Sequence, residues 1–216
     1  MVAELTGDAG GGRGLTSHER AAGRPWDDSY RDGGAPWDIG EPQPAVARLV
    51  GEGGFVGAVL DAGCGTGENA LCVAALGLPV LGVDVAETAV AVARKKAAER
   101  GIAAEFAVAD AFRLDRLGRR FDTVLDCGLF HTFDRDERRK YVASLGSVLE
   151  CGGTLYVLCF SDIGPELGPH PVAREELSAA FGLADGWKVA AVEPDRIRAT
   201  FNVDGLPAWL ATIKRI

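Results

Sequence analysis

A glycine-rich run between an apolar segment and a predicted helix is the part of this chain best suited to bind a ligand. It reads Asp61-Ala62-Gly63-Cys64-Gly65-Thr66-Gly67-Glu68-Asn69, after apolar residues 55–60 and before a predicted helix at 70–76. Glycine adopts positive φ angles and lets the backbone approach a ligand closely. A strand, such a turn and a helix N-terminus form a nucleotide-binding site. Asp61 would repel a phosphate, so a positively charged ligand is expected, such as a sulfonium with an amino acid tail.

The spacing of these glycines separates two kinds of nucleotide site. Gly63, Gly65 and Gly67 follow a G-x-G-x-G pattern, whereas a dinucleotide fingerprint follows G-x-G-x-x-G. Glu68 stands where the third fingerprint glycine would be, which makes a nicotinamide-dependent dehydrogenase the weakest alternative. A P-loop is excluded because the run contains no Gly-Lys-Ser/Thr sequence.

The glycine run resembles motif I of the class I S-adenosylmethionine (SAM)-dependent methyltransferases. The resemblance implies that SAM is the cofactor and S-adenosyl-L-homocysteine (SAH) the product. It also implies that the turn supplies these cofactor-binding residues: Asp61, Gly63, Cys64, Gly65, Gly67 and Asn69.

Further acids follow the next predicted strands. Asp84 lies near the ~20-residue spacing at which an acid reaches a ribose, and its carboxylate can accept both ribose hydroxyls. The run Ala109-Asp110-Ala111-Phe112 resembles the adenine-binding motif of the family. There Asp110 would accept from the exocyclic amine, and a backbone amide near Ala111 would donate to a ring nitrogen. Phe112 either lines the adenine pocket or belongs to the core. The predicted cofactor site is completed by Val85, Asp126 and Cys127.

An aromatic, proline-rich segment precedes the predicted sheet. It contains Trp26-Asp27-Asp28-Ser29-Tyr30 and the run from Pro36 to Pro44. It resembles the W-x-x-S-W…PWDxGxPxP segment of the thiopurine, thiol and halide methyltransferase group. Trp26, Tyr30 and Trp37 match the cofactor-contacting aromatics of that group, with tyrosine in place of the second tryptophan. An aromatic face attracts a sulfonium by roughly 0.5–2 kcal/mol. The alternative is that these aromatics only attach the N-terminus to the domain.

The run from Asp126 to Asp134 is similar to the actinobacterial small-molecule methyltransferases that act on heterocyclic toxins and quinols. His131 follows the fourth predicted strand, and an unperturbed pKa of ~6.5 suits a base that takes a proton from the methyl acceptor. The alternative roles for His131 are substrate positioning and a purely structural one. The substrate-binding candidates are Phe130, Phe133, Phe160 and His170. No metal site is predicted.

The elements that position these residues alternate between strand and helix. Strands are expected at 55–60, 79–83, 104–108, 121–125, 154–160, 187–192 and 209–213, with an extension at 197–201. Helices are expected at 45–50, 86–100, 134–149 and 174–181. Gly152-Gly153 is expected to break the chain before the fifth strand. Continuous apolar strands between helices indicate an α/β fold with a doubly wound, mainly parallel, seven-stranded Rossmann-like sheet.

Composition limits the other possibilities. The chain has 216 residues, enough for one large domain, and a net charge of −8, which disfavours nucleic acid as a partner. No apolar run approaches the ~20 residues of a membrane span, and no secretory signal is recognised. An odd number of cysteines, five, suggests reduced thiols in the cytoplasm. Residues 1–24 are expected to be flexible, and 25–216 to form the methyltransferase domain, with a cap at 25–44.

The predicted reaction is SN2 displacement of the SAM methyl group by an O, N or S nucleophile. The acceptor is expected to be a small, aromatic or heterocyclic molecule. A thiol or halide methyltransferase is the alternative within the fold, and a non-catalytic SAM-binding protein is the alternative of another class. The protein is expected to be a monomer or a homodimer.

Overall fold

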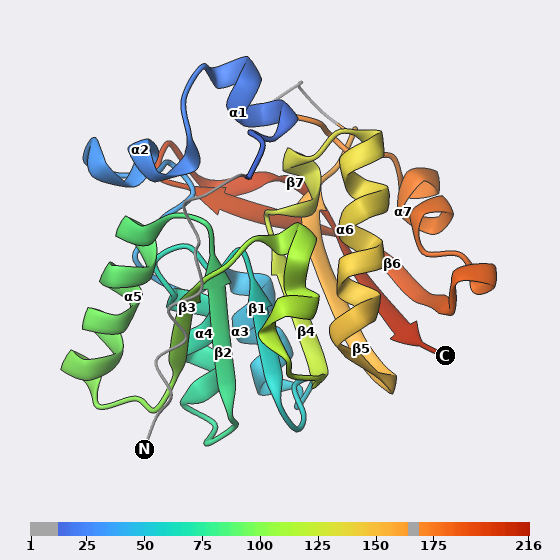
Figure 1. Ribbon diagram of the computed structural model, residues 1–216, viewed down its shortest axis with the longest axis horizontal. Coiled ribbons are helices and arrows are strands. Elements are labelled where there is room, and N and C mark those ends of the chain that lie inside the picture. Colours follow the sequence, from blue (N-terminus) through green and yellow to red (C-terminus); the bar gives the residue numbers. More distant parts are fainter. Residues whose placement is uncertain (1–12, 164–168) are drawn as a thin grey trace.

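A single seven-stranded sheet forms the centre of the molecule (Figure 1). The computed structural model describes residues 13–163 and 169–216. The strand order is β3-β2-β1-β4-β5-β7-β6, parallel from β3 to β5, with β7 antiparallel to both of its neighbours. The strands are β1 Val59–Ala62, β2 Val80–Asp84, β3 Glu105–Val108, β4 Phe121–Cys127, β5 Leu149–Phe160, β6 Trp187–Ala199 and β7 Asn202–Arg215. This sheet confirms the predicted fold class.

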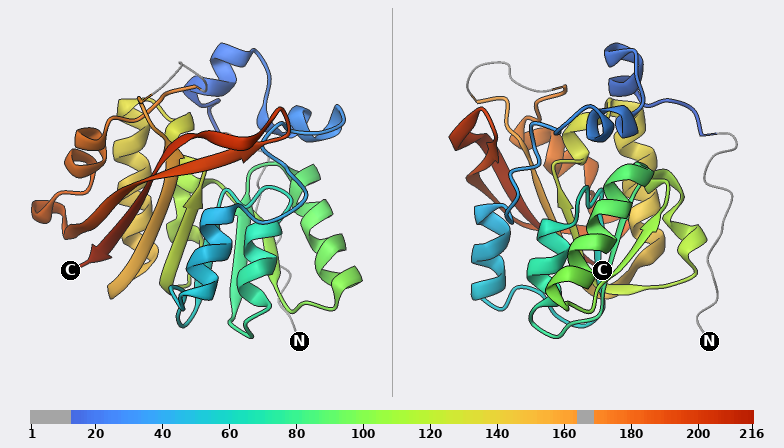
Figure 2. Two further views of the ribbon diagram at one scale, coloured as in Figure 1. Left: turned by 180° about the vertical axis from the view of Figure 1, so that it is seen from behind. Right: turned by 90° about the vertical axis from the view of Figure 1, so that its left-hand side faces the viewer.

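Helices cover both faces of the sheet (Figures 1 and 2). The helices are α1 Ser17–Ala22, α2 Trp26–Arg31, α3 Pro44–Gly51, α4 Glu68–Ala74, α5 Glu87–Arg100, α6 Arg135–Val148 and α7 Arg174–Ala180, with shorter 3-10 turns η1 Ala111–Leu117, η2 Phe130–Thr132 and η3 Leu183–Asp185. One apolar cluster joins the sheet to α3, α4 and α5, and the other joins it to α6 and α7. β1 is buried on both faces, as expected of a central parallel strand.

The topology places a crevice at the carboxyl ends of the strands. From β1 the chain moves outward to β2 and β3, and then returns to β4 on the other side of β1. The connections after β1 and β4 therefore diverge, and ligands of open α/β sheets bind at such a switch point. Helices α1 and α2 and the β6–β7 hairpin lie over this end of the sheet (Figure 2).

Several element boundaries differ from the sequence prediction. Helix α4 begins at Glu68 because Gly67, at φ +88°, already ends the turn as its N-cap. Strand β5 begins at Leu149, so the prediction that Gly152-Gly153 breaks the chain before it was wrong. The glycines instead lie within a register shift opposite β4, with Gly152 at φ +83°. Strands β6 and β7 form one long hairpin that turns at Thr200 and Phe201.

The N-terminal segment contains structure that the sequence analysis did not anticipate. Of residues 1–24, the first 12 lie outside the described residues, but Ser17–Ala22 form α1. A capping box explains this helix: the Thr16 hydroxyl accepts from the Glu19 N–H, and the Glu19 carboxylate accepts from the Thr16 N–H. The predicted division of the chain after residue 24 stays a prediction. No helix in the described part of the chain has the length and apolar character needed to cross a membrane.

Candidate functional site

A cavity of about 340 Å³ opens at the carboxyl ends of the strands, within the size range of small-molecule sites. Its wall combines the glycine turn, the ends of β2 and β4, the aromatic segment, α1 and the β6–β7 hairpin. Most of the sequence-predicted site residues line it: Trp26, Tyr30, Trp37, Gly63, Cys64, Gly65, Gly67, Asn69, Asp84, Val85, Asp110, Ala111, Phe112, Cys127, His131, Phe133 and Phe160.

Two glycines of the turn combine a positive φ angle with a close neighbour, Gly65 on the cavity side and Gly67 on the side of α5. Gly65 adopts φ +51°, and a Cβ atom there would lie 3.0 Å from the Tyr30 hydroxyl. Gly67 adopts φ +88°, and its Cβ would lie 2.8 Å from the Cβ of Ala93 and 2.9 Å from the Phe106 ring. A side chain at either position would strain the backbone, and at Gly67 it would also collide with Ala93 and Phe106. The turn thus leaves its backbone against the cavity while α5 packs closely behind it.

Asp84 is held rigidly at the end of β2. Its Oδ2 accepts the Gly65 N–H at 2.9 Å, and its Oδ1 accepts the Ala86 N–H at 2.9 Å. Burial raises the pKa of this carboxyl, although the backbone hydrogen bonds oppose that shift. The fixed carboxylate in the cavity wall fits the predicted contact with the ribose hydroxyls.

The residues predicted to hold adenine lie at the start of η1. The Asp110 Oδ1 accepts the Phe112 N–H at 2.9 Å and so caps this turn. Phe112 both lines the cavity and packs against Phe133, with ring centroids 4.7 Å apart; its contact with adenine stays a prediction. On β4, burial raises the pKa of the Cys127 thiol well above its usual value. That thiol is therefore a neutral group of the wall.

The aromatic segment closes over the glycine turn. The Trp37 Nε1–H donates to the Tyr30 hydroxyl at 2.9 Å, and the rings of Trp26 and Trp37 meet edge to face with centroids 5.4 Å apart. Asp38 accepts from the Thr66 hydroxyl at 2.8 Å, which ties the segment directly to the turn. These aromatics therefore form a wall of the cavity as well as an attachment of the N-terminal segment.

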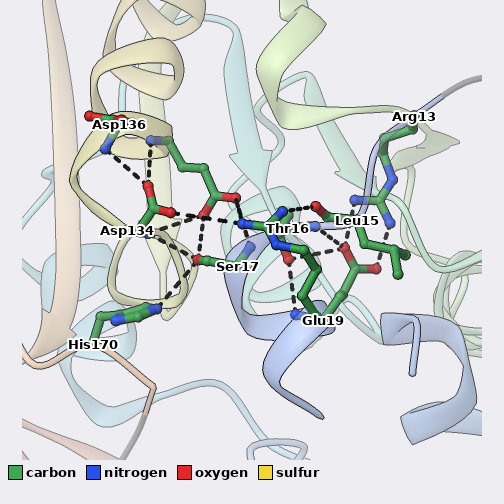
Figure 3. Close-up of polar contacts among 10 residues, drawn as sticks. Arg13, Leu15, Thr16, Ser17, Glu19, Asp134, Asp136 and His170 are labelled. Carbon is green, nitrogen blue, oxygen red and sulfur yellow. Dashed lines mark hydrogen bonds and ion pairs between the residues drawn. The ribbon is translucent and has the colours of Figure 1, made fainter. Parts of the chain in front are cut away.

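Helix α1 is held in place by hydrogen bonds to two buried carboxylates, those of Glu19 and Glu137 (Figure 3). Glu19 is only 1% exposed and accepts two bonds from Arg13, at 2.5 and 2.8 Å, and one from the Trp26 N–H at 3.2 Å. Burial alone would raise the pKa of Glu19, but the hydrogen bonds from Arg13 and the backbone bring it below the usual value. Ser17 donates its N–H and hydroxyl to Glu137 of α6, at 2.7 and 2.5 Å. The helix is thus joined both to the aromatic segment and to α6.

His131 has a defined protonation state. The Phe160 N–H donates to its Nδ1 at 3.2 Å, and burial, with a smaller contribution from the positive charge of Arg138, lowers its pKa to about 3. The neutral ring therefore carries its hydrogen on Nε2, where it can donate to a ligand in the cavity. This geometry fits the positioning role and leaves no free lone pair for the role of a base.

Four predicted site residues do not reach the cavity wall. Phe130 is fully buried between Phe181 and Arg138, so its assignment to the substrate wall was wrong; it belongs to the core. His170 lines a neighbouring depression and contacts the Ser17 hydroxyl at 3.3 Å. Asp61 and Asp126 are 1% and 0% exposed.

The two buried acids lie beneath the cavity, and burial shifts both toward their neutral forms. Neither carboxylate oxygen of Asp61 has a hydrogen-bond partner within the described residues. Burial, with the charges of Asp126 and Asp84, raises the pKa of Asp61 to about 7. Asp126 accepts the N–H groups of Leu129 and Phe130 at 3.1 and 3.2 Å, yet burial raises its pKa to about 7 as well.

Two groups of wall residues were not predicted from the sequence. Arg13, Thr16 and His18 come from α1 and the residues just before it; the Thr-x-x-Glu capping box was a signal that could have found this helix. The other group comes from the β6–β7 hairpin, where no local motif marks a site: Ile197, Ala199, Phe201 and Leu206.

The charge of the cavity fits a cationic methyl donor. The wall acids Asp38, Asp84 and Asp110 have no ion-pair partner among the described residues, and Arg13 of the wall is engaged by Glu19. The other two wall acids are paired, Glu41 with Arg198 and Glu68 with Lys96 and Arg100. A cation is stabilised by such an excess of carboxylates, and a bare phosphate is repelled.

Known proteins resemble this chain in both sequence and fold. A methyltransferase-domain family matches residues 59–153. The 2-heptyl-1-hydroxyquinolin-4(1H)-one methyltransferase of Mycobacteroides abscessus is 38% identical over 197 residues, covering 89% of this chain and 80% of its own. The probable thiol methyltransferase 2 of Arabidopsis thaliana is 32% identical over 137 residues, which cover 62% of this chain and 61% of the plant protein.

A solved structure agrees with these relatives. It comes from work on the conversion of a disulfide bond into a thioacetal group during echinomycin biosynthesis, and superimposes with a TM-score of 0.80 at 37% identity, covering 88% of this chain and 90% of the other. The sheet, the glycine turn and the acid-lined cavity define a Rossmann-like enzyme that binds a cationic nucleoside. Together with the sequence matches, they show that the chain belongs to the SAM-dependent methyltransferases. The predicted enzyme class, cofactor and family resemblance are thereby confirmed.

Proposed function

We propose that this methyltransferase acts on a heteroatom of a small, uncharged aromatic or heterocyclic acceptor. Support comes from the relative in Mycobacteroides abscessus, named for a hydroxyquinolinone, and above all from the apolar part of the cavity wall. That part consists of Phe112, Leu129, Phe133, Phe160, Ile197 and Leu206. Apolar and aromatic walls with few polar groups are typical of sites for flat organic ligands.

The charges of the wall restrict the acceptor further. Among the described wall residues, Arg13 is the only arginine or lysine, and both of its terminal nitrogens bond to Glu19. An acceptor carboxylate would therefore meet acids and no available cation. We expect an acceptor without a negatively charged substituent.

The residues of the chain hold and orient the two reactants. When bound, SAM supplies a methyl group already activated on a sulfonium. Asp84, Asp110 and the glycine turn would hold its nucleoside, and the aromatic faces of Trp26, Tyr30 and Trp37 would exclude water. The Nε2–H of His131 would donate a hydrogen bond to the acceptor. Such positioning can contribute ~7–11 kcal/mol to methyl transfer.

A screen with methyl-labelled SAM tests this proposal. The panel pairs hydroxyquinolones and phenols with analogues that carry an added carboxylate, and includes an aryl thiol and iodide. We expect labelled product from the uncharged heterocycles, with at least tenfold lower kcat/KM for the carboxylated analogues. The Asp84→Ala variant provides the control for SAM-dependent label. SAM binding without labelled product from any uncharged aromatic would contradict the proposal.

A sulfur nucleophile is the second candidate. It is favoured by the 37%-identical structure associated with sulfur chemistry and by the plant thiol methyltransferase relative. The thiol and iodide arms of the screen distinguish it: kcat/KM values for aryl thiols well above those for the matched phenols would favour sulfur.

We further propose that the enzyme works in the cytoplasm as a monomer or homodimer and does not act on nucleic acid. The net charge of −8 supports the last point. Size-exclusion chromatography with light scattering tests the oligomeric state.

A further inference from the structure

Two histidines on the cavity wall are in different chemical states. The Nδ1 lone pair of His131 is occupied by the Phe160 N–H, so this ring can donate a hydrogen bond but cannot take a proton. Within the described residues, no group hydrogen-bonds to His18, whose pKa responds only to burial and to nearby charges. A neutral histidine in that state has a nitrogen lone pair that can accept a proton.

His18 is also well placed for proton transfer. Its ring stacks on Trp26, with centroids 4.5 Å apart and planes at 24°, and lines the same cavity as His131. The side chain is half-buried, so a proton that it takes up can pass on to solvent. Helix α1 is fixed by Ser17 bonding to Glu137 and by Glu19 bonding to Arg13, so the ring is held over the cavity.

We infer that His18 is the general base that removes the proton from the methyl acceptor, while His131 holds the acceptor as a neutral hydrogen-bond donor. This inference rests on the proposed function, because it requires an acceptor whose nucleophilic O, N or S carries a proton. It assigns a catalytic role to the N-terminal helix, outside the sheet and its motifs.

The proposed step balances in atoms and charge. The acceptor heteroatom forms a bond to the methyl carbon, and the electron pair of the broken carbon–sulfur bond stays on sulfur. The proton of the acceptor passes to the free ring nitrogen of His18, which becomes an imidazolium. That proton then leaves to solvent, and the products are the methylated acceptor and SAH.

The groups around His18 keep it available as a base. Burial lowers its pKa from the usual value, as does the neighbouring His170 from the segment after β5, while Glu19 on its own helix raises it. His131 on η2 faces the same space, and its own pKa is lowered in part by His18. The net lowering leaves the ring unprotonated near neutral pH, where a general base is effective.

The test compares acceptors that do and do not carry a proton. His18→Phe preserves a ring against Trp26 but removes the base, and His18→Gln checks that result without the aromatic ring. We expect kcat/KM to fall by about 10²-fold with phenol, less with the more acidic 4-nitrophenol, and not at all with quinoline, an uncharged heterocycle whose nucleophilic nitrogen carries no proton. The control is Arg20→Gln, which alters an exposed contact of the same helix with Glu137 and is expected to retain all three rates. SAM affinity, measured by calorimetry, should be unchanged in both His18 variants.

A second readout is the pH dependence of kcat/KM. With phenol, the wild-type value should fall as the pH drops through the lowered pKa of His18, and His18→Phe should lack this loss; with quinoline neither protein should show it. Equal losses of rate with phenol and quinoline in the His18 variants, or the same acidic limb with phenol in both proteins, would overturn the assignment of His18. If wild-type enzyme methylates only iodide or an alkyl thiol, the proposed function fails instead, and the pH profile with the alkyl thiol then decides whether His18 acts as a base.

Discussion

The end of the cavity proposed to hold the methyl donor and the end proposed to receive the acceptor are built differently. The donor end consists of the glycine turn and of acids fixed by neighbouring backbone, such as Asp84 between the N–H groups of Gly65 and Ala86. The acceptor end is assembled from side chains of α1, η2 and the β6–β7 hairpin, which lie far apart in sequence. A donor common to a family is recognised by local backbone, whereas a variable acceptor is recognised by surrounding segments that can change independently.

The largest effect should come from the donor end. Asp84→Ala removes the carboxylate predicted to accept hydrogen bonds from both ribose hydroxyls. It also leaves the N–H groups of Gly65 and Ala86 without the acceptor that they have now. Losing hydrogen bonds to a charged group should weaken SAM binding by about 3 kcal/mol, or ~100-fold in Kd. Calorimetry measures this directly. Asp115→Ala, which alters an exposed acid on η1, is the matched control. Unchanged SAM affinity would place the donor elsewhere.

A smaller effect is expected where α1 joins the aromatic segment. Glu19→Gln weakens the buried attachment of Arg13 and Trp26, at about 2 kcal/mol for charged hydrogen bonds, and should raise the acceptor KM ~30-fold. Steady-state kinetics and SAM calorimetry together locate the effect. The exposed Glu175→Gln on α7 is the control. If SAM affinity falls as far as acceptor affinity does, the donor and acceptor ends of the cavity do not act independently.

The smallest effect concerns the charge beneath the donor end. Asp61 has a pKa of about 7 in the folded protein against an ordinary value of 3.8, so between these values the folded state binds a proton that the unfolded state does not. Its contribution therefore favours folding below pH 7 and is lost as the pH rises through 7, by about 1.4 kcal/mol between pH 6 and pH 8. Asp61→Asn should remove this contribution, giving a variant that is relatively more stable at pH 8.

Urea unfolding of the SAM-free protein at pH 6 and pH 8 measures this difference. Two other groups also make the stability depend on pH: Asp126, with a pKa raised to about 7, and His131, with a pKa lowered to about 3. Both are present in wild type and variant, so the measured quantity is the difference in pH dependence between the two proteins. The exposed Asp136→Asn is the control. Identical pH dependence in wild type and Asp61→Asn would show that Asp61 is ionised in the folded protein.

The accuracy of the sequence prediction followed the same division between the two ends. The glycine turn, the strand-end acids, α5 with its Gly101 cap, and the Asp134 cap of α6 were all predicted, because each depends on a short local pattern. The boundary of β5 was wrong, because pairing with β4 accommodates Gly152 and Gly153 in a register shift. Phe130 was placed in the substrate wall because an aromatic after a strand end does not reveal which way it points.

Local sequence is enough to predict the sheet, the class of methyl donor and the strand-end acids proposed to bind it. These features follow from hydrophobic periodicity and from glycines whose backbone angles no other residue adopts readily. The states of the two histidines depend instead on tertiary contacts: a backbone N–H occupies Nδ1 of His131, and the chain brings His18 from the N-terminus to the cavity wall. A proton acceptor is defined by its partners and its burial, and both are set by contacts between distant segments.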